Sequence, residues 1–182
     1  MAGLLLIAAL VAYFLFTPLA KSEQVEYVYI DADDTQDSVF TKITPLANTL
    51  ALNGLKNIAR HTDYEKNIRT GRYAINPGEG ALMTFRRLRN GMQSSMRLTI
   101  PEARTMDRLA ALLGQKLMLD SAEIAEALLS EETCQHYGFD TATIAAMFVP
   151  DTYEVYWNTS LNSLLEGIAL SHKFLEVNKS IK

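Results

Sequence analysis

Residues 72–89, RYAINPGEGALMTFRRLR, contain a short strand, a turn and an amphipathic helix in immediate succession. The run Arg72–Ile75 favours a strand, and Asn76-Pro77-Gly78 favours a turn directly after it. A helix is expected from about Glu79 to Arg89, because apolar residues recur there at helical spacing. These apolar residues are Leu82, Phe85 and Leu88. The stretch is therefore one strand–turn–helix unit.

Similar units lie on both sides of this one. Strands are expected at 25–30, 72–75 and 96–100, and helices are expected to begin near residues 35, 46, 79, 105, 121 and 161. A further mixed aromatic and polar segment covers 148–157. The strands follow one another at irregular intervals, which excludes a regular solenoid. The sequence therefore predicts an α+β fold made of small subdomains.

Composition excludes several classes of function. The chain has 182 residues, a net charge of -4 and 21% charged residues, so a basic surface for nucleic acid is not expected. The single cysteine, Cys134, cannot form an internal disulfide, and the three histidines are scattered. No metal site is expected from this spacing, and no cofactor is expected either.

The first twenty residues are almost entirely apolar, and the first charged side chain is Lys21. As a helix, residues 2–20 would extend about 28 Å, close to the hydrocarbon thickness of a bilayer. We therefore expect a transmembrane anchor over residues 1–21. A cleaved signal peptide and a buried soluble helix are the two alternatives, although no basic leader and no Ala-x-Ala motif support cleavage.

The segment 148–157 holds the residues best suited to contact a sugar. Tyr153, Tyr156 and Trp157 offer flat apolar faces with polar edges, although such residues are also ordinary core material. Asp151 and Glu154 could form a carboxylate pair, but an extended segment would direct them to opposite faces. We therefore expect Asp151 to act as a cap or turn acceptor rather than as a catalytic group.

Several motifs together resemble a known family. The most specific are Gly71-Arg72-Tyr73, Leu88-Arg89-Asn90-Gly91-Met92-Gln93 and Pro150-Asp151-Thr152-Tyr153, each in the expected order after an apolar N-terminal segment. This order resembles the N-terminal half of the bacterial endolytic murein transglycosylases, the YceG-like family formerly labelled aminodeoxychorismate lyase. One departure is Ala145-Ala146, where many members carry Glu-Gly.

The resemblance implies a membrane-anchored lytic transglycosylase of the bacterial cytoplasmic (inner) membrane, with the bulk of the chain on the extracytoplasmic side. It implies non-hydrolytic cleavage of nascent glycan strands, leaving 1,6-anhydro ends, by one glutamate that acts as acid and then as base. That glutamate follows the Pro150–Tyr153 block beyond residue 182, so this chain contains no catalytic residue and Glu154 does not take that role. The implied glycan contacts are Asp151, Thr152, Tyr153, Tyr156 and Trp157.

The same resemblance suggests a division of the chain and a set of partners. Residues 1–21 would be the anchor, 22–70 a first strand–helix subdomain, 71–140 a LysM-like subdomain, and 141–182 the start of a truncated catalytic domain. The expected partners are peptidoglycan glycan strands, the membrane and cell-wall synthases. The alternative function is a non-catalytic, membrane-tethered peptidoglycan-binding module.

Overall fold

The computed structural model describes residues 3, 5, 9, 12, 13, 16–102 and 105–180, without the side chains of 175–180. The chain divides into two compact units, residues 1–94 and 95–182. Each unit has its own two-stranded antiparallel sheet and its own apolar core. The predicted α+β class is therefore correct, and each unit can be described by itself.

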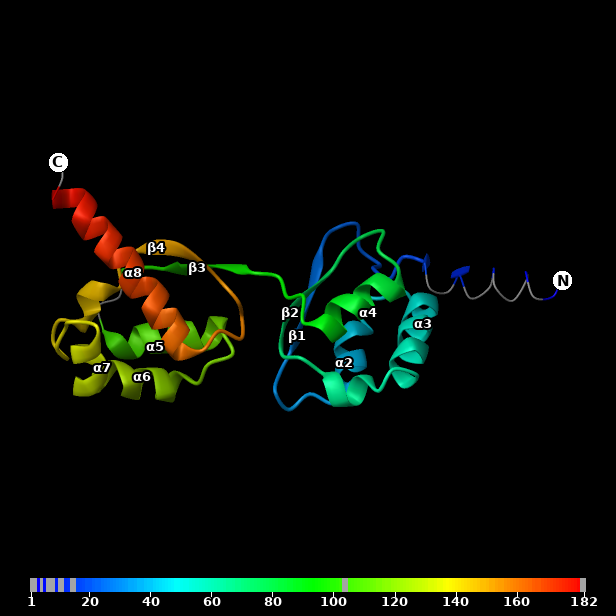
Figure 1. The fold of residues 1–182 in the computed structure, drawn as a ribbon, viewed down its shortest axis with the longest axis horizontal. Helices are drawn as coiled ribbons and strands as arrows, with labels where there is room; N and C mark the ends of the chain where they lie inside the picture. Colours follow the sequence, from blue (N-terminus) through cyan, green and yellow to red (C-terminus); the bar gives the residue numbers. More distant parts are fainter. Residues whose placement is uncertain are drawn as a thin grey trace. The chain divides into compact units, whose positions relative to one another are not determined.

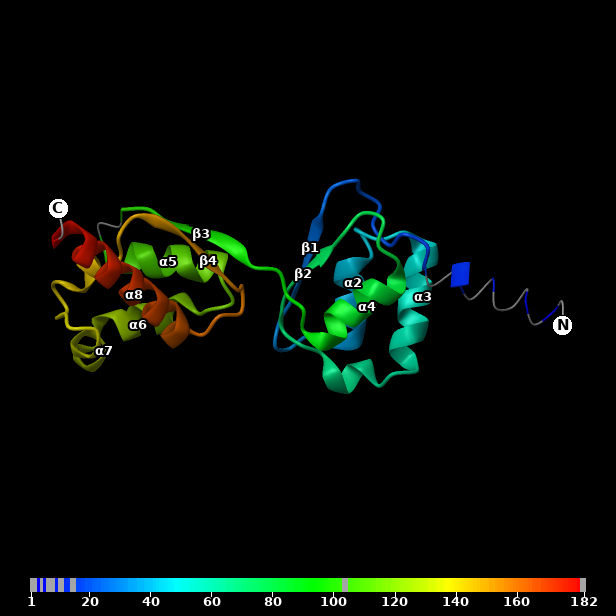
Figure 2. The same cartoon turned by 45° about the horizontal axis from the view of Figure 1, so that its top comes forward.

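The first unit contains β1, α2, α3, the 3₁₀ helix η1, β2 and α4, in this order along the chain (Figure 1). Their bounds are Glu26–Ile30, Gln36–Ile43, Thr49–Arg60, Tyr64–Asn67, Gly71–Ile75 and Ala81–Asn90. The strands β1 and β2 pair with Val28 opposite Tyr73 at the centre. The three α-helices lie on one side of these strands in both views (Figure 2), where they cover the buried side chains of Val28 and Ile30.

The second unit repeats this order of elements with one additional helix. It contains β3 (Met96–Ile100), α5 (Met106–Lys116), α6 (Ser121–Leu129), α7 (Glu131–His136), η2 (Ile144–Met147), β4 (Asp151–Val155) and α8 (Leu161–Ser180). The strands β3 and β4 pair with Leu98 opposite Tyr153 at the centre. In both units a 3₁₀ helix precedes the second strand, and a helix follows it.

A tyrosine at the centre of the second strand makes the same hydrogen bond in each unit. The Tyr73 hydroxyl donates to the Arg69 carbonyl at 2.9 Å, and the Tyr153 hydroxyl donates to the Val149 carbonyl at 3.3 Å. Each bond reaches back four residues and ties the strand to the segment before it. The two units therefore share a local feature as well as an order of elements.

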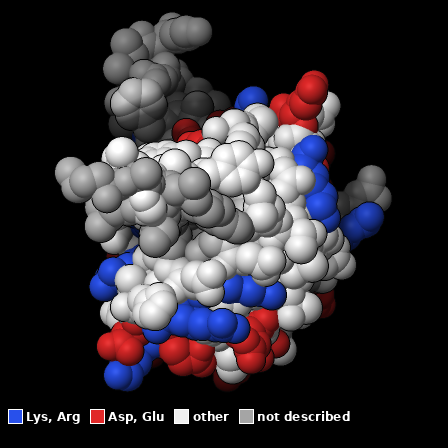
Figure 3. Space-filling view, turned by 90° about the vertical axis from the view of Figure 1, so that its right-hand side faces the viewer, with Lys and Arg blue, Asp and Glu red and all other residues white. Residues whose placement is uncertain are grey.

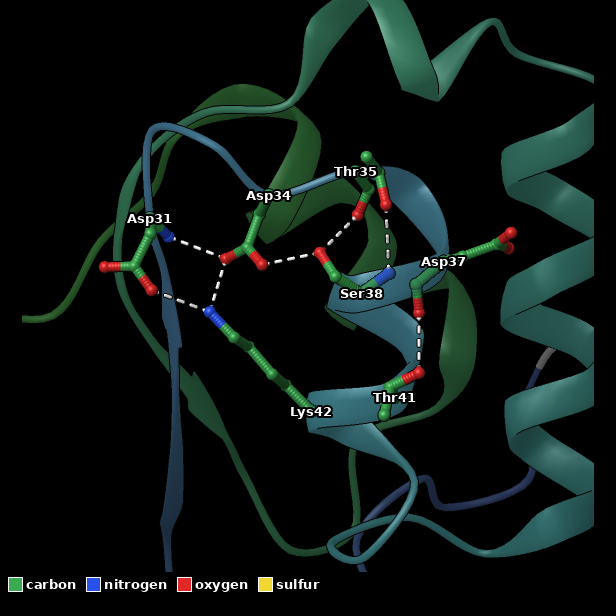
Figure 4. A network of polar contacts seen from close by, with 7 residues as sticks. All are labelled: Asp31, Asp34, Thr35, Asp37, Ser38, Thr41 and Lys42. Carbon is green, nitrogen blue, oxygen red and sulfur yellow. Dashed lines mark hydrogen bonds and ion pairs between the residues drawn. The ribbon is translucent and has the colours of Figure 1, made fainter.

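Local signals explain where the helices begin. The side chains of Thr35, Thr105 and Asp120 each accept a hydrogen bond from a backbone N–H in the first turn of the next helix. These bonds satisfy donors that have no partner within a helix, which is why such residues favour N-cap positions. Thr35 belongs to a larger polar network around the start of α2 (Figure 4).

The apolar stripes expected from helical spacing face the two cores. Phe85 and Leu88 of α4 are buried in the first unit, and Leu109 and Leu113 of α5 are buried in the second. Leu82 is only half-buried. The ring of Phe85 meets that of Tyr64 edge-on, with 5.6 Å between ring centroids. Each core therefore combines a helix stripe with residues from a 3₁₀ helix or a strand.

The prediction of a transmembrane helix over 1–21 is wrong for the part of the chain that the structure describes. Among those residues, no helix is both long enough and apolar enough to cross a bilayer. Residues 1, 2, 4, 6–8, 10, 11, 14 and 15 of the expected anchor lie outside the described residues. The predicted single-pass location in a cytoplasmic membrane depended on this helix and is corrected with it.

The end of the expected anchor belongs to the folded first unit instead. Leu19 is fully buried and Ala20 is 7% exposed, both within the apolar core. The Leu19 N–H donates to the Glu79 carbonyl at 2.8 Å, and the Asn48 N–H donates to the Leu19 carbonyl at 2.7 Å. The apolar side chains of Leu19 and Ala20 therefore pack against other residues of the first unit.

The two units also differ in extent from the divisions expected at residues 70 and 140. The pairing of β1 with β2 joins residues on both sides of position 70, and the pairing of β3 with β4 does the same for position 140. The assignment of these segments to a LysM-like subdomain and to the start of a catalytic domain stays a prediction.

Candidate functional site

All five residues expected to contact glycan lie on β4 and the turn that follows it. Asp151, Thr152 and Tyr153 begin the strand, and Tyr156 and Trp157 follow its end. A cavity of about 470 Å³ lies between β4 and α8. We call it the β4–α8 groove; its lining includes every β4 residue, Tyr156, and Ser163, Gly167 and Ser171 of α8.

The three aromatic residues have different surroundings. Tyr153 is half-buried and packs against the core of the second unit, and this burial, followed by the negative charge of Asp151, raises the pKa of its hydroxyl. Trp157 is also half-buried, and its carbonyl accepts a hydrogen bond from the Met118 N–H at 2.8 Å. Tyr156 is 53% exposed and lines the groove. It is the aromatic ring of the three best placed to stack on a ligand.

The outer face of the β3–β4 sheet is polar. Across the two strands, Arg97 lies opposite Glu154 and Thr99 lies opposite Thr152. The two threonine hydroxyls are 3.0 Å apart, and the Ser95 hydroxyl donates to the Glu154 carboxylate. This face therefore presents hydroxyls, a carboxylate and a guanidinium, which are groups that hydrogen-bond to sugar hydroxyls.

The two carboxylates of β4 do not form a catalytic pair. Asp151 lies opposite Ile100 and Glu154 lies opposite Arg97, so an odd number of strand positions separates them and their side chains leave opposite faces. The Asp151 carboxylate accepts a hydrogen bond from the Thr152 N–H at 2.7 Å. Asp151 therefore accepts a local hydrogen bond from within a strand, whereas the sequence suggested a cap or turn.

Cys134 and the basic run 86–89 both have structural surroundings. The Cys134 thiol is buried, which raises its pKa, and it contacts the Leu128 carbonyl at 3.4 Å. In the basic run 86–89, Arg87 forms an ion pair with Glu79 at 2.6 Å and donates to the Ala74 carbonyl. Within the described part of the chain, no group of three or more His, Cys, Asp or Glu residues could hold a metal ion.

Charges of both signs adjoin on the face drawn in Figure 3. Lysine and arginine side chains lie beside aspartate and glutamate side chains along one margin of this face, and most of the remaining described surface is uncharged. Mixed charge of this kind is typical of a solvated surface.

Comparison with known proteins assigns the family. A model of the YceG-like family matches residues 28–179, which include most of the first unit and nearly all of the second. The chain belongs to the YceG-like family. The resemblance predicted from its motifs is confirmed at this level.

A solved YceG-like structure gives a more distant comparison. A crystal structure of a yceG-like protein from Listeria monocytogenes matches with 14% sequence identity and a TM-score of 0.44. The match covers 87% of this chain and 58% of the Listeria chain. No curated protein matches.

The other motifs of the YceG-like resemblance meet within the first unit. Gly71 has φ +145°, and a Cβ there would lie 2.5 Å from the Gln93 side-chain oxygen. Gly91 ends α4 with φ +68°, and a Cβ there would lie 2.8 Å from Arg69 Cδ. Arg69 in turn donates to the Arg89 carbonyl at 3.2 Å. These motif residues therefore fix the backbone between residues 69 and 93.

Sequence reasoning did not identify the α8 side of the groove. Ser163, Gly167 and Ser171 follow one another at four-residue intervals on one side of α8. This stripe of small residues was visible in the sequence. The sequence did not show that this stripe lines a groove, because only the folded chain places it opposite β4.

Proposed function

We propose that the protein acts in peptidoglycan processing as a lytic transglycosylase, and that β4 and its following turn contact the glycan strand. Membership of the YceG-like family over residues 28–179 carries this proposal. The implied reaction is endolytic cleavage of nascent glycan to 1,6-anhydro ends. The glycan contacts are assigned to Asp151, Thr152, Tyr153, Tyr156 and Trp157, and cell-wall synthases stay the expected protein partners.

Tyr156 is the proposed stacking platform. Its exposed ring lines the β4–α8 groove together with Thr152, Glu154 and Ser163, so one ligand can meet an apolar surface and hydrogen-bonding groups together. Tyr153 and Trp157 support this arrangement from half-buried positions. They hold the backbone on which the ring of Tyr156 is presented.

The proposed chemistry needs one carboxyl that first donates a proton to the glycosidic oxygen and then accepts one from the attacking sugar hydroxyl. Neither β4 carboxylate is assigned this role, because Asp151 is bound to the Thr152 N–H and Glu154 to the Ser95 hydroxyl. By the family resemblance, neither of them is expected to be the catalytic glutamate. For residues 1–182 we therefore propose substrate contact rather than proton transfer.

Binding to purified, peptide-free glycan strands tests this function. We expect the chain to bind them, and we expect Tyr156→Ala to weaken binding by about 3- to 10-fold, as for the loss of one stacked ring. Tyr29→Ala is the matched control, since Tyr29 is 40% exposed and lies in the other unit. Equal weakening by both variants, or no binding at all, would contradict the proposal.

Mass spectrometry of the same mixture tests the assignment of roles. We expect no 1,6-anhydro ends from this chain. Such ends, if they disappeared in Glu154→Gln, would make Glu154 the catalytic acid and overturn the assignment above.

A further inference from the structure

The β4–α8 groove has an open strand edge as one of its walls. Within the described part of the chain, β4 forms a ladder with β3 only, so its second edge has no strand partner there. All five β4 residues line the groove along this edge. An open edge carries backbone donors and acceptors at the spacing of a neighbouring strand, and it is a template for strand addition.

The hydrogen bonds of β4 identify which backbone groups face the groove. The Thr152 N–H donates to Asp151 rather than across the ladder, and the hydroxyls of Thr152 and Thr99 meet at 3.0 Å. Both features indicate that Thr99 and Thr152 form a non-hydrogen-bonded pair. Because this pattern alternates along a strand, Thr152 and Glu154 direct their backbone groups away from β3. Both residues are exposed.

The opposite wall leaves space for an extended chain. Ser163, Gly167 and Ser171 line the groove from α8, and a Cβ at Gly167 would have no atom within 4 Å. Buried Leu164 and Ile168 also contribute to the lining. A strand needs about 4.8 Å between backbones, and small residues on the facing helix permit this approach to β4.

The charged residues in the groove lining and the apolar surface beside the groove indicate what kind of ligand could bind there. The groove lining contains the carboxylates of Asp151 and Glu154 but no lysine or arginine, so it favours a neutral or basic ligand. A second cavity, of about 350 Å³, also includes Asp151 and Ser171, and its other lining residues are Leu170 and Phe174. These two α8 side chains are 71% and 70% exposed. The groove thus continues onto apolar surface.

We propose that the β4–α8 groove binds an extended polypeptide segment, neutral or basic and with alternating apolar side chains, as a third strand on β4. The segment pairs with the outward backbone groups of Thr152 and Glu154, and the Thr152 N–H exchanges its bond to the Asp151 carboxylate for one to a carbonyl of the segment. The side chains of the segment alternate between two faces, so its charged residues meet Glu154 on the outer face and its apolar residues lie toward α8, on the face of Asp151. The proposed glycan contact uses Tyr156 and other residues of the same β4 wall, so the peptide and the glycan are expected to compete for the groove.

A defined peptide tests the proposal on the full 182-residue chain. The probe is a hexapeptide of alternating valine and lysine, acetylated and amidated at its ends. We expect it to shift the amide NMR signals of Thr152 and Glu154. An analogue N-methylated at alternate residues keeps the charge but loses backbone donors, and it should bind at least about tenfold more weakly. A glutamate-for-lysine analogue should also bind more weakly.

Two variants of the chain complete the test. Thr152→Pro removes the outward N–H without removing a bond to β3, and proline is tolerated at such edge positions. Gly167→Gln fills the groove from α8 instead. Both should abolish peptide binding, whereas Thr99→Pro, the matched change on the far edge of β3, should retain it. Unchanged melting temperatures would show that the variants are folded.

Three results would overturn the proposal. The first is equal binding of the N-methylated peptide, which would indicate attraction by charge alone. The second is loss of binding in Thr99→Pro but not in Gly167→Gln. The third is a response of the Thr152 and Glu154 amides to peptide-free glycan strands but not to the peptide, which would make the groove a sugar site.

Discussion

At the scale of single residues, the turn between β1 and α2 shows how a charge is held in a small domain. The Asp34 side chain is 6% exposed and accepts hydrogen bonds from Lys42, from the Ser38 hydroxyl and from the Asp31 N–H (Figure 4). Burial by itself would raise the pKa of Asp34, but these bonds outweigh burial and lower it. Lys42 also contacts Asp31 at 2.7 Å. The ionised network therefore stabilises the folded state.

Replacing Lys42 by Met should lower the free energy of unfolding at pH 7 by about 1 to 2 kcal/mol, because Asp34 loses its cation while Lys42 itself is partly exposed. The pKa of Asp34 is lowered on folding, so its contribution is present above the unfolded-state value and is lost as pH falls through the folded-state value. Urea unfolding should therefore show a difference between the proteins that shrinks below about pH 4.

Lys66→Met is the control for this measurement. Lys66 pairs with Asp63 at 3.8 Å, and both side chains are more than three-quarters exposed. We expect little change in stability. A pH-independent effect of Lys42→Met would show that its hydrocarbon stem, rather than its charge, is what matters.

At the scale of elements, two helical glycines have opposite surroundings. Gly114 of α5 lies close to the start of α6, where an added Cβ would be 2.9 Å from Ser121 Cβ and 3.1 Å from its backbone nitrogen. Gly167 of α8 faces open space. Glycine is therefore required for helix packing at the first position but not at the second.

Gly114→Ala should destabilise the protein by about 1 to 3 kcal/mol, because α5 and α6 must move apart. Gly167→Ala should stabilise it by about 0.5 to 1 kcal/mol, because alanine is the better helix former. Denaturant titrations of the two variants measure both effects. Changes of the same sign would show that helix propensity or packing alone governs both positions.

At the scale of the whole molecule, two units with the same order of elements have separate cores. Val28, Tyr73 and Phe85 belong to the first core, and Leu98, Leu109 and Ile168 belong to the second. No buried residue belongs to both clusters among those that the structure describes. A substitution that destabilises one core should therefore leave the stability of the other unit unchanged.

Phe85→Ala should destabilise the first unit by about 3 to 5 kcal/mol, as expected for a buried aromatic side chain. Hydrogen exchange followed by mass spectrometry should show faster exchange in β1, β2 and α2 to α4. Exchange in α5 and α6 should stay as in the unchanged protein. Faster exchange in α5 and α6 as well would show that the two units unfold together.

Part of the candidate site was predictable from the sequence. The segment around Asp151 is extended, so Asp151 and Glu154 diverge, although Asp151 accepts its local backbone N–H within a strand rather than at a cap or turn. Tyr153, Tyr156 and Trp157 could not be distinguished beforehand, because each is compatible with both stacking and packing. Their surroundings depend on residues such as Val149 and Met118, which are distant in sequence or arranged only by the fold.

The sequence by itself determined most of the helices and strands, the α+β class and the family, because caps, turns and hydrophobic periods are local properties. Only the tertiary structure decided which strands pair, since three α-helices and a 3₁₀ helix separate β3 from β4 in the sequence. It also decided that Leu19 and Ala20 pack against protein, and that small residues of α8 face β4. The type of an apolar or small residue predicts burial or close packing. Which residue it contacts depends on segments that are distant in the sequence and meet only in the folded chain.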